Sequence, residues 1–167
     1  MYEILIVGGG PAGLTAAIYA ARAGKRVAVL ERGSTGGQII SAPLVENYPG
    51  IPSVSGTELA RQMTEQACTF GAEIVYTEAV GLEKTPAGFR VLCTDGVREA
   101  KTVILATGAA HRRLDLPWET TLTGCGVSYC AVCDGAFYEG LDVAVVGGGD
   151  TAVQDAHLPQ RDAYPSA

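Results

Sequence analysis

The sequence predicts an α/β protein whose parallel sheet carries an antiparallel meander. The first observation is "YEILIVGGGPAGLTAAIYAARAGKRVAVLER" (residues 2–32), in which an apolar run, glycines, an alanine-rich stretch and a second apolar run follow one another. Continuous short apolar runs are typical of parallel strands that are buried on both faces. The second observation is "LDVAVVGGGDTAVQDA" (residues 141–156), which repeats the order of strand, glycines and helix.

The N-terminal segment predicts one complete strand–helix–strand unit. We expect a strand over residues 4–7, a helix over residues 12–23 that ends at Gly24, and a strand over residues 27–30 that leads to Glu31. Alanines and glycine on the helix favour close packing on a sheet, and a glycine after the last turn is a common helix stop. A unit of about 30 residues is the usual size for this motif.

The next part of the chain predicts a long loop and a second helix. Residues 33–54 are rich in Gly, Pro and Ser without periodicity, and a loop of this length in a compact domain is usually functional. Ser55 and Glu58 have the spacing of a capping box. One apolar helical face follows, which ends before Gly71 and consists of Leu59, Met63, Ala67 and Phe70.

Residues 73–105 predict a small antiparallel meander. Strand-like runs are interrupted there at "TPAG" and "TDG", which are turn sequences. The last run, "TVILATG" (residues 102–108), predicts a buried strand that ends in small residues.

Gly8, Gly10 and Gly13 form a GxGxxG pattern between a strand and a helix. The first glycine permits a tight turn, the second lets the backbone approach a pyrophosphate, and the third lets the helix pack on the strand. Glu31 follows about 20 residues later, where a carboxylate can accept hydrogen bonds from a ribose diol. The alternative is a glycine-rich turn with an unrelated surface glutamate, but the strand, the helix and Glu31 together favour a dinucleotide site.

A second loop with Gly147, Gly149 and Ala152 has the related pattern GxGxxA. Two such loops in one chain predict two dinucleotides, one that donates a hydride and one that receives it. A single dinucleotide would need only one loop.

"SYCAVCDG" (residues 128–135) contains a CxxC pair, for which three interpretations compete. Cys125, Cys130 and Cys133 match three ligands of a plant-type iron–sulfur cluster, but no fourth cysteine follows. A zinc site would need to borrow His111 or His157. The third interpretation is a redox dithiol, because CxxC lowers the pKa of one thiol and closes a small, exchangeable disulfide loop.

The residues around the pair have simpler interpretations. Asp134 is placed to exchange a proton with a departing thiolate, although a turn residue before Gly135 is the alternative. We expect Cys68 and Cys93 to be core residues, and the sequence assigns no role to Cys125.

Composition excludes several classes of partner. A net charge of −6 argues against nucleic acid and anionic membranes. No apolar run approaches the ~20 residues of a membrane span, and the N-terminus lacks the basic region of a signal peptide. With five cysteines and no secretory signal, a reducing cytoplasm is the expected compartment.

Six motifs then identify a family resemblance. "GGGPAG", "GGQI", "VENYPG", "ATG", "SYCAVCDG" and "GGGDTAV", in this order and spacing, resemble the bacterial low-molecular-weight thioredoxin reductases from Tyr2 to Ala156. The resemblance implies a Rossmann-like FAD-binding domain over residues 1–115. It also implies the start of a second Rossmann-like domain over residues 116–167, which binds NADPH and carries the CxxC motif.

The resemblance also implies roles for individual residues. The FAD pyrophosphate would lie on Gly8, Gly9, Gly10, Pro11, Ala12 and Gly13, and the adenosine ribose on Glu31. Further FAD contacts would come from Gly37, Gln38, Asn47, Val80, Ala106, Thr107 and Gly108. NADPH would lie on Gly147, Gly149, Asp150, Thr151 and Ala152. Cys133 would face the flavin, Cys130 would attack the thioredoxin disulfide, and Asp134 would be the acid–base group, with no metal site.

By this resemblance the chain is an enzyme in which electrons pass from NADPH to FAD, to the Cys130–Cys133 disulfide and then to thioredoxin. The full-length family implies a cytoplasmic homodimer. Two alternatives remain, a related flavin disulfide reductase that serves another dithiol protein and a non-catalytic, FAD-binding remnant.

The final residues, "HLPQRDAYPSA" (157–167), depart from the family pattern, and Pro159 is expected to end the preceding helix. The hypothesis from sequence is a frameshift or truncation near residue 157. The apolar strand over residues 143–146 would then have uncovered edges, and the isolated chain is expected to be unstable and poorly active.

Overall fold

The computed structural model describes residues 1–157, with only the backbone described for Val132 and Cys133. The predicted end of the last helix at Pro159, and the departure from the family pattern after residue 157, lie outside the described residues. The chain divides into two compact units, Met1–Ala110 and His111–Ala167, which are treated separately below.

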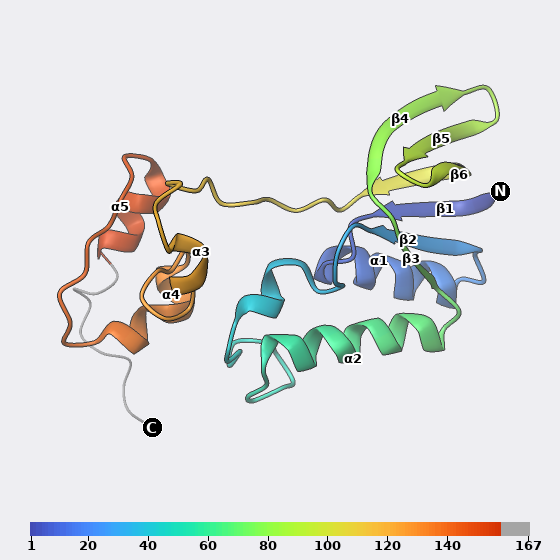
Figure 1. Cartoon of the computed structure of the whole chain (residues 1–167). Helices are drawn as coiled ribbons and strands as arrows, with labels where there is room; N and C mark the ends of the chain where they lie inside the picture. Colours follow the sequence, from blue (N-terminus) through green and yellow to red (C-terminus); the bar gives the residue numbers. More distant parts are fainter. Residues whose placement is uncertain (158–167) are drawn as a thin grey trace. The chain divides into compact units, whose positions relative to one another are not determined.

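The first unit is built on a six-stranded sheet in the order β3-β2-β1-β6-β5-β4 (Figure 1). Four strands are parallel: β1 (Tyr2–Val7), β2 (Val27–Glu31), β3 (Glu73–Tyr76) and β6 (Gly96–Leu105). β4 (Ala79–Thr85) and β5 (Gly88–Cys93) continue the sheet as an antiparallel meander with β6. The predicted α/β class, a parallel sheet with an antiparallel meander, is therefore confirmed.

One detail of the expected meander is wrong, because β3 pairs in parallel with β2 and takes no part in it. The helix between these strands provides the crossover that returns the chain to the same direction. The sequence turns at "TPAG" and "TDG" are correctly placed, since β4 ends at Thr85, β5 spans Gly88–Cys93 and β6 begins at Gly96.

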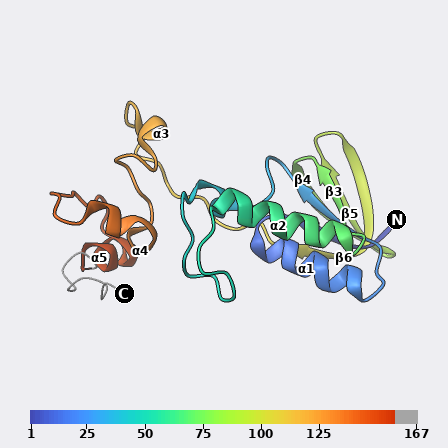
Figure 2. The same cartoon turned by 90° about the horizontal axis from the view of Figure 1, so that it is seen from below.

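Two helices, α1 (Pro11–Arg22) and α2 (Gly56–Thr69), lie side by side on one face of the parallel strands (Figure 2). The core on this side consists of fully buried apolar side chains from β1, β2 and both helices, among them Ile6, Leu14, Val29 and Leu59. Three of the four residues predicted for the apolar face of α2, Leu59, Met63 and Ala67, are therefore buried as expected.

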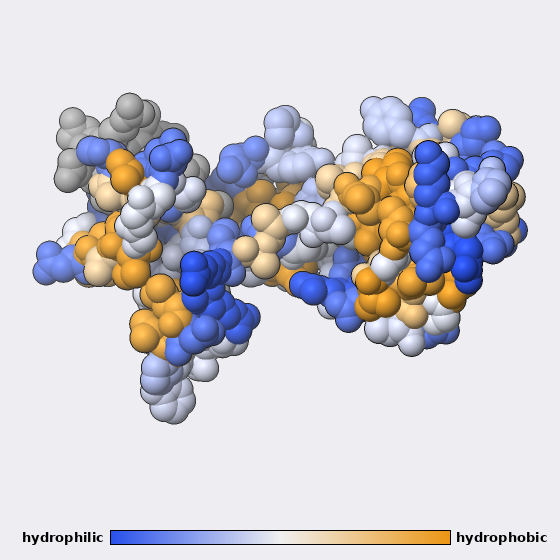
Figure 3. Space-filling model, turned by 90° about the horizontal axis from the view of Figure 1, so that it is seen from above, coloured by the Kyte–Doolittle hydropathy of each residue, from blue (hydrophilic) through white to orange (hydrophobic). Residues whose placement is uncertain are grey.

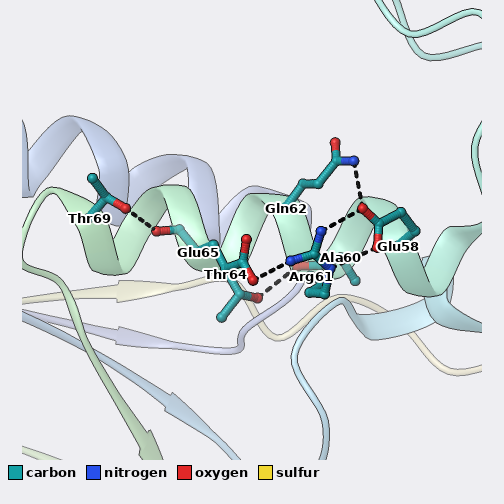
Figure 4. A network of polar contacts seen from close by, with 7 residues as sticks. All are labelled: Glu58, Ala60, Arg61, Gln62, Thr64, Glu65 and Thr69. Carbon is teal, nitrogen blue, oxygen red and sulfur yellow. Dashed lines mark hydrogen bonds and ion pairs between the residues drawn. The ribbon is translucent and has the colours of Figure 1, made fainter.

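The start of α2 is half of the predicted capping box. The Glu58 backbone N–H donates to the hydroxyl oxygen of Ser55 (3.2 Å). The Glu58 carboxylate does not return to Ser55 but accepts from Arg61, which also reaches Glu65 (Figure 4). The guanidinium is the stronger partner because it is charged and lies one turn away on the same helix.

Two expectations for the end of α2 are wrong: Cys68 is exposed and Phe70 is exposed. Cys68 follows the buried Ala67 by one residue, a rotation of about 100° about the helix axis that takes it off the apolar face. Phe70 lies past the last helical turn, where the Arg22 guanidinium covers its ring at 5.4 Å.

The opposite face of the sheet has its own core. Leu5, Ala28 and Leu30 pack with Val91 and Ala100, so that the meander contributes to this second cluster. Cys93 belongs to the same cluster and is buried, as predicted. Apolar surface also remains exposed on this unit (Figure 3), and the exposed side chains of β4 and β6 include Val80, Leu82 and Val97.

The second unit has short helices joined by loops: α3 (Glu119–Leu122), α4 (Ala131–Asp134), the 3₁₀ turn η2 (Gly135–Tyr138) and α5 (Asp150–His157). The strand predicted over residues 143–146 is wrong, since this segment has no regular structure and its valines are exposed. A strand needs neighbours for its N–H and C=O groups, and no other strand occurs in the described part of this unit.

Candidate dinucleotide site and dithiol segment

The glycine loop after β1 has no room for side chains at two of its positions. Gly8 has a φ of +108°, and a Cβ built on it would lie 2.2 Å from the carbonyl oxygen of Ala106. A Cβ on Gly13 would lie 1.9 Å from the carbonyl oxygen of Gly8. These two glycines therefore determine how closely β1, α1 and the end of β6 approach one another.

The N-terminus of α1 is open by comparison. Gly10 is the N-cap residue with a φ of −75°, and a Cβ there would meet only Gly37, at 3.9 Å. Pro11 occupies the first helical position and Ala12 is exposed. No acidic side chain lies in the first turn. Free N–H groups and the positive end of the helix dipole make this N-terminus suited to an anion such as a pyrophosphate.

Glu31, at the end of β2, is fixed by backbone N–H groups from both sides. The N–H of Gly9 donates to its Oε2 (2.7 Å) and the N–H of Gly33 donates to its Oε1 (2.9 Å). Each carboxylate oxygen has further lone pairs that can accept from a ribose hydroxyl. The carboxylate is thus held beside the glycine loop in the place that the sequence predicted for a ribose contact.

The long loop after β2 packs against the glycine loop through a short 3₁₀ helix, η1 (Gly37–Ser41). The N–H of Gly36 donates to the carbonyl of Gly9 (2.7 Å). Gly37 has a φ of +56°, and a Cβ there would lie 3.3 Å from the Cα of Gly10. The Gln38 amide donates to the carbonyl of Ala109. Of the residues predicted in this loop, Gly37 therefore lies against Gly10 of the glycine loop, and Gln38 is hydrogen-bonded to the segment after β6.

Sequence reasoning missed two glycines that shape this region. A Cβ on Gly36 would lie 2.5 Å from the Cβ of Ala60, and a Cβ on Gly56 would lie 1.7 Å from the carbonyl oxygen of Ile39. The available signal was the occurrence of glycines within and directly after a non-periodic loop, but no spacing rule links them to α2.

The turn after β6 closes the other side of the loop. The N–H of Ala106 donates to the carbonyl of Val7 (2.8 Å), and Gly108 has a φ of +66° beyond Thr107. Asn47 and Val80 differ, since both are exposed and no described contact joins them to the glycine loop. The structure thus brings together the loop, Glu31, residues 37–38 and residues 106–108.

A further network supports the end of β2. The N–H of Thr77 donates to the carbonyl of Glu31 (2.9 Å), and the buried Thr77 hydroxyl donates to Oδ1 of Asp95 (2.5 Å). Arg98 donates to both oxygens of Asp95 (2.8 and 2.7 Å). Hydrogen bonds from Arg98, and then from Thr77, lower the pKa of Asp95 to about 2. Sequence reasoning missed this network, because hydroxyl and carboxylate residues in turns have no distinctive spacing.

In the second unit, the dithiol segment (residues 128–135) is held at its start by hydrogen bonds to Glu119. This glutamate is only 5% exposed. Its carboxylate accepts from the N–H groups of Leu114 (3.0 Å) and Leu116 (3.2 Å) and from the Tyr129 hydroxyl. The hydrogen bond from Tyr129 is the main cause that lowers the pKa of Glu119, and it raises the pKa of Tyr129. Tyr129 also stacks on His111 at 4.9 Å, so the residue before Cys130 is fixed.

Cys130 is disulfide-bonded, whereas Cys125 is a free and exposed thiol. Cys133 lies in α4, and its side chain is outside the described part of the chain. Asp134 ends α4 and accepts a hydrogen bond from Ser128 (2.6 Å). Cys130 is therefore present in the oxidised form of a dithiol, with a carboxylate in the same short segment.

The second glycine loop lies before α5. Gly147 has a φ of +143°, and a Cβ there would lie 3.0 Å from the Cβ of Ala152. The N–H of Val153 donates to the carbonyl of Gly149 (3.2 Å), and Asp150 and Thr151 form the first turn of α5. The second glycine loop therefore packs against the start of α5. The described residues of this unit include no sheet from which the loop could emerge.

Known proteins resemble this chain over nearly its whole length. The thioredoxin reductase of Treponema pallidum is 46% identical over 161 residues, which are 96% of this chain and 52% of that protein. The thioredoxin reductase of Bacillus subtilis is 44% identical over 155 residues, which are 93% of this chain and 49% of that protein. The chain thus spans about half the length of the curated relatives it matches.

Solved structures agree with this result. The thioredoxin reductase structure from Streptococcus pyogenes has a TM-score of 0.89 and 49% identity, and the match covers 96% of this chain and 53% of that one. The thioredoxin reductase structure from Giardia duodenalis has a TM-score of 0.87 and 38% identity, with coverages of 96% and 52%. Residues 2–158 match the family model described as pyridine nucleotide-disulphide oxidoreductase. The chain therefore belongs to the pyridine nucleotide-disulphide oxidoreductase family.

Proposed function

We propose that this chain carries the flavin-binding and dithiol part of an NADPH-dependent thioredoxin-disulfide reductase. One observation carries the proposal: a glycine loop closed by Glu31 and a CxxC segment followed by Asp134 occur in one member of this family. Named relatives at 44–46% identity are thioredoxin reductases, which supports the same conclusion.

FAD is the dinucleotide that we assign to the first unit. The N-terminus of α1, with Gly10, would hold its pyrophosphate, and Glu31 would accept from the adenosine ribose. The loop around Gln38 and the turn at Thr107 would line the rest of the molecule, and Asn47 and Val80 are proposed as outer contacts. When bound, FAD supplies the chemistry that accepts a hydride and delivers two electrons to a disulfide.

NADPH is proposed for the second loop, on residues 147–152. The functional boundary would then lie near residue 115, with the FAD part over residues 1–115 and the NADPH part over residues 116–167. None of the helices in the described part of the chain is long and apolar enough to cross a membrane. A cytoplasmic homodimer with thioredoxin as its protein substrate is part of the same proposal.

The dithiol would transfer electrons by thiol–disulfide exchange. The Cys130 thiolate attacks one sulfur of the thioredoxin disulfide, so that a new S–S bond forms while the old one breaks. The departing sulfur takes the electron pair of the broken bond and a proton from Asp134. The Cys133 thiolate then attacks Cys130, which releases reduced thioredoxin and restores the disulfide of the pair.

Two measurements on the purified chain test this proposal. Titration with FAD, followed by flavin fluorescence, should show saturable binding that weakens in Glu31→Gln. The chain should also be reduced with dithiothreitol, desalted and mixed with oxidised thioredoxin, whose thiols are then counted. We expect transfer of one dithiol per chain, lost in Cys130→Ser and retained in Cys125→Ser. Absence of both FAD binding and thiol transfer would contradict the proposal.

A further inference from the structure

Ser128 is hydrogen-bonded to both Cys130 and Asp134, the thiol-bearing and the carboxyl-bearing residue of the dithiol segment. Its hydroxyl lies 2.6 Å from Oδ2 of Asp134, and it accepts the backbone N–H of Cys130 at 3.1 Å. The N–H of Asp134 in turn donates to the carbonyl of Cys130 (3.0 Å), which closes the turn between them. All three residues are half-buried.

These contacts determine where the single hydroxyl hydrogen of Ser128 points. The N–H of Cys130 occupies one lone pair of the oxygen, and two acceptors compete for the hydrogen. The carboxylate oxygen of Asp134 is at 2.6 Å and the carbonyl of Cys130 is at 3.2 Å. Of the two O···O distances, the one to Asp134 is the shorter and is normal for a hydroxyl donor, so the hydrogen is directed to the Asp134 carboxyl group.

We propose that Ser128 is a positioning residue for Asp134 in thiol–disulfide exchange, an inference that rests on the proposed function. The hydroxyl engages Oδ2 and so fixes the rotation of the carboxyl group, which leaves Oδ1 as the oxygen that exchanges the proton. Ser128 thereby acts through Asp134.

The proton balance shows at which step Ser128 contributes. As the S–S bond of the substrate breaks, its departing sulfur takes the proton of the Asp134 carboxyl, and water returns a proton to the carboxylate afterwards. The hydroxyl of Ser128 donates to the carboxylate that this transfer creates. It therefore favours the transfer, in addition to orienting the group.

A purely structural role for Ser128 makes a different prediction. The hydroxyl also caps the N–H of Cys130, and loss of that cap would slow every reaction of Cys130 alike. A positioning role toward Asp134 affects only those reactions in which the departing thiolate needs a proton. The two roles can therefore be separated by the choice of disulfide substrate.

The experiment uses the whole chain, reduced and desalted, in single-turnover reactions with two small disulfides. Hydroxyethyl disulfide releases a basic alkyl thiolate that needs a proton, whereas the nitrobenzoate disulfide DTNB releases a stable aromatic thiolate that does not. Ser128→Ala should slow the alkyl reaction about tenfold, a fraction of the usual contribution of general acid catalysis. It should change the DTNB reaction less than about twofold, and Ser128→Thr should restore the alkyl rate.

Two more variants complete the test. Ser128→Gly removes the hydroxyl without adding a charge, so it should show the same selective loss even if Ser128→Ala does not fold. Asp134→Asn should also slow only the alkyl reaction. Adding Ser128→Ala to Asp134→Asn should cause no further loss, because the two residues act as one unit.

Each other outcome overturns the inference in a recognisable way. Equal slowing of both disulfides by Ser128→Ala and Ser128→Gly would show a structural role, and unchanged rates with both disulfides would show that Ser128 has no role. If only Asp134→Asn slows the alkyl reaction selectively, Asp134 has the proposed acid–base role but Ser128 has no positioning role. A wild-type chain that reacts with neither disulfide would overturn the proposed function itself, and the positioning role with it.

Discussion

The carbonyl oxygen of Gly8 lies 1.9 Å from the position that a Cβ on Gly13 would occupy. This close approach links the residue after β1, which is half-buried, to the first turn of α1, where Gly13 is buried. Backbone atoms on both sides cannot rotate away as a side chain could. The third glycine of the motif is therefore needed for the fold itself, before any ligand is considered.

Gly13→Ala should accordingly destabilise the first unit. The methyl group would have to push α1 from β1, and overpacking of this kind typically costs about 1–3 kcal/mol. Urea denaturation followed by far-UV circular dichroism measures the loss. A midpoint equal to that of the wild-type chain would contradict the contact.

Gly10→Ala is the matched substitution within the same motif. Because φ is −75° and the nearest heavy atom is 3.9 Å away, the methyl group fits the unliganded chain. Stability should change by less than about 1 kcal/mol, as expected for an N-cap position. Binding of ADP, measured by calorimetry, should weaken strongly, because the methyl group lies where a pyrophosphate approaches. Unchanged ADP binding would indicate that the anion does not bind at this N-terminus.

Glu31→Gln tests the ribose contact. An amide keeps only one acceptor oxygen, so the N–H of either Gly9 or Gly33 loses its charge-assisted partner. Affinity for FAD should fall about tenfold, corresponding to about 1.4 kcal/mol. Affinity for FMN, which lacks the adenosine, should change much less. Equal losses for both flavins would point to a general disturbance of the loop.

Asp95→Asn tests the network behind Glu31 through its pH dependence. The pKa of Asp95 is lowered from 3.8 to about 2, with the hydrogen bond from Arg98 as the first cause and that from Thr77 as the second. A carboxylate with a lowered pKa in the folded state stabilises the protein above its unfolded pKa. This stabilisation is lost as the pH falls from about 4 toward 2. The free energy of unfolding should thus fall less steeply over this range in Asp95→Asn.

Glu58→Gln provides a comparison for that measurement, since Arg61 and then Gln62 lower the pKa of Glu58 to about 2 as well. Replacing Glu58 should likewise make the free energy of unfolding fall less steeply over this pH range, but without an effect on FAD binding. Asp95→Asn should weaken FAD binding, because Asp95 accepts a hydrogen bond from the Thr77 hydroxyl, and the N–H of Thr77 donates to the backbone carbonyl of Glu31. Identical binding in both variants would show that the network does not reach the ribose contact.

Much of the first unit follows from short-range rules. The runs that form β1 and β2 are continuous and apolar, and the glycine spacing placed Gly8, Gly13 and Glu31 correctly with respect to one another. Such features are predictable because each depends on the local period or on a fixed backbone conformation.

Other features depend on what a residue meets far along the chain. Gly36 is needed because α2 passes beside it, and Thr77 matters because Asp95 folds back onto it. Nothing in the neighbouring sequence specifies either partner. Ser128 is different, because its partners are close in sequence, but a serine before a CxxC pair has no spacing rule of its own.

Two errors arose where local pattern and environment disagree. The apolar run at residues 143–146 has the composition of a strand, yet strand formation requires a neighbouring strand, which the described part of this unit lacks. Cys68 was expected in the core as a residue on the apolar side of the helix, but its angle on α2 directs it to solvent. Hydrophobicity alone did not separate these cases.

The position of β6 has a consequence for how the protein is made. β6 pairs with β1 although about 90 residues separate them, and it leads into the Ala106 carbonyl that meets Gly8. During translation, β1, α1 and β2 emerge early and can form their strand–helix–strand unit alone. The ribosome must nevertheless synthesise the chain past residue 106 before the glycine loop has its second wall. A nascent chain stalled before β6 would therefore contain the complete glycine motif, yet it should capture no nucleotide.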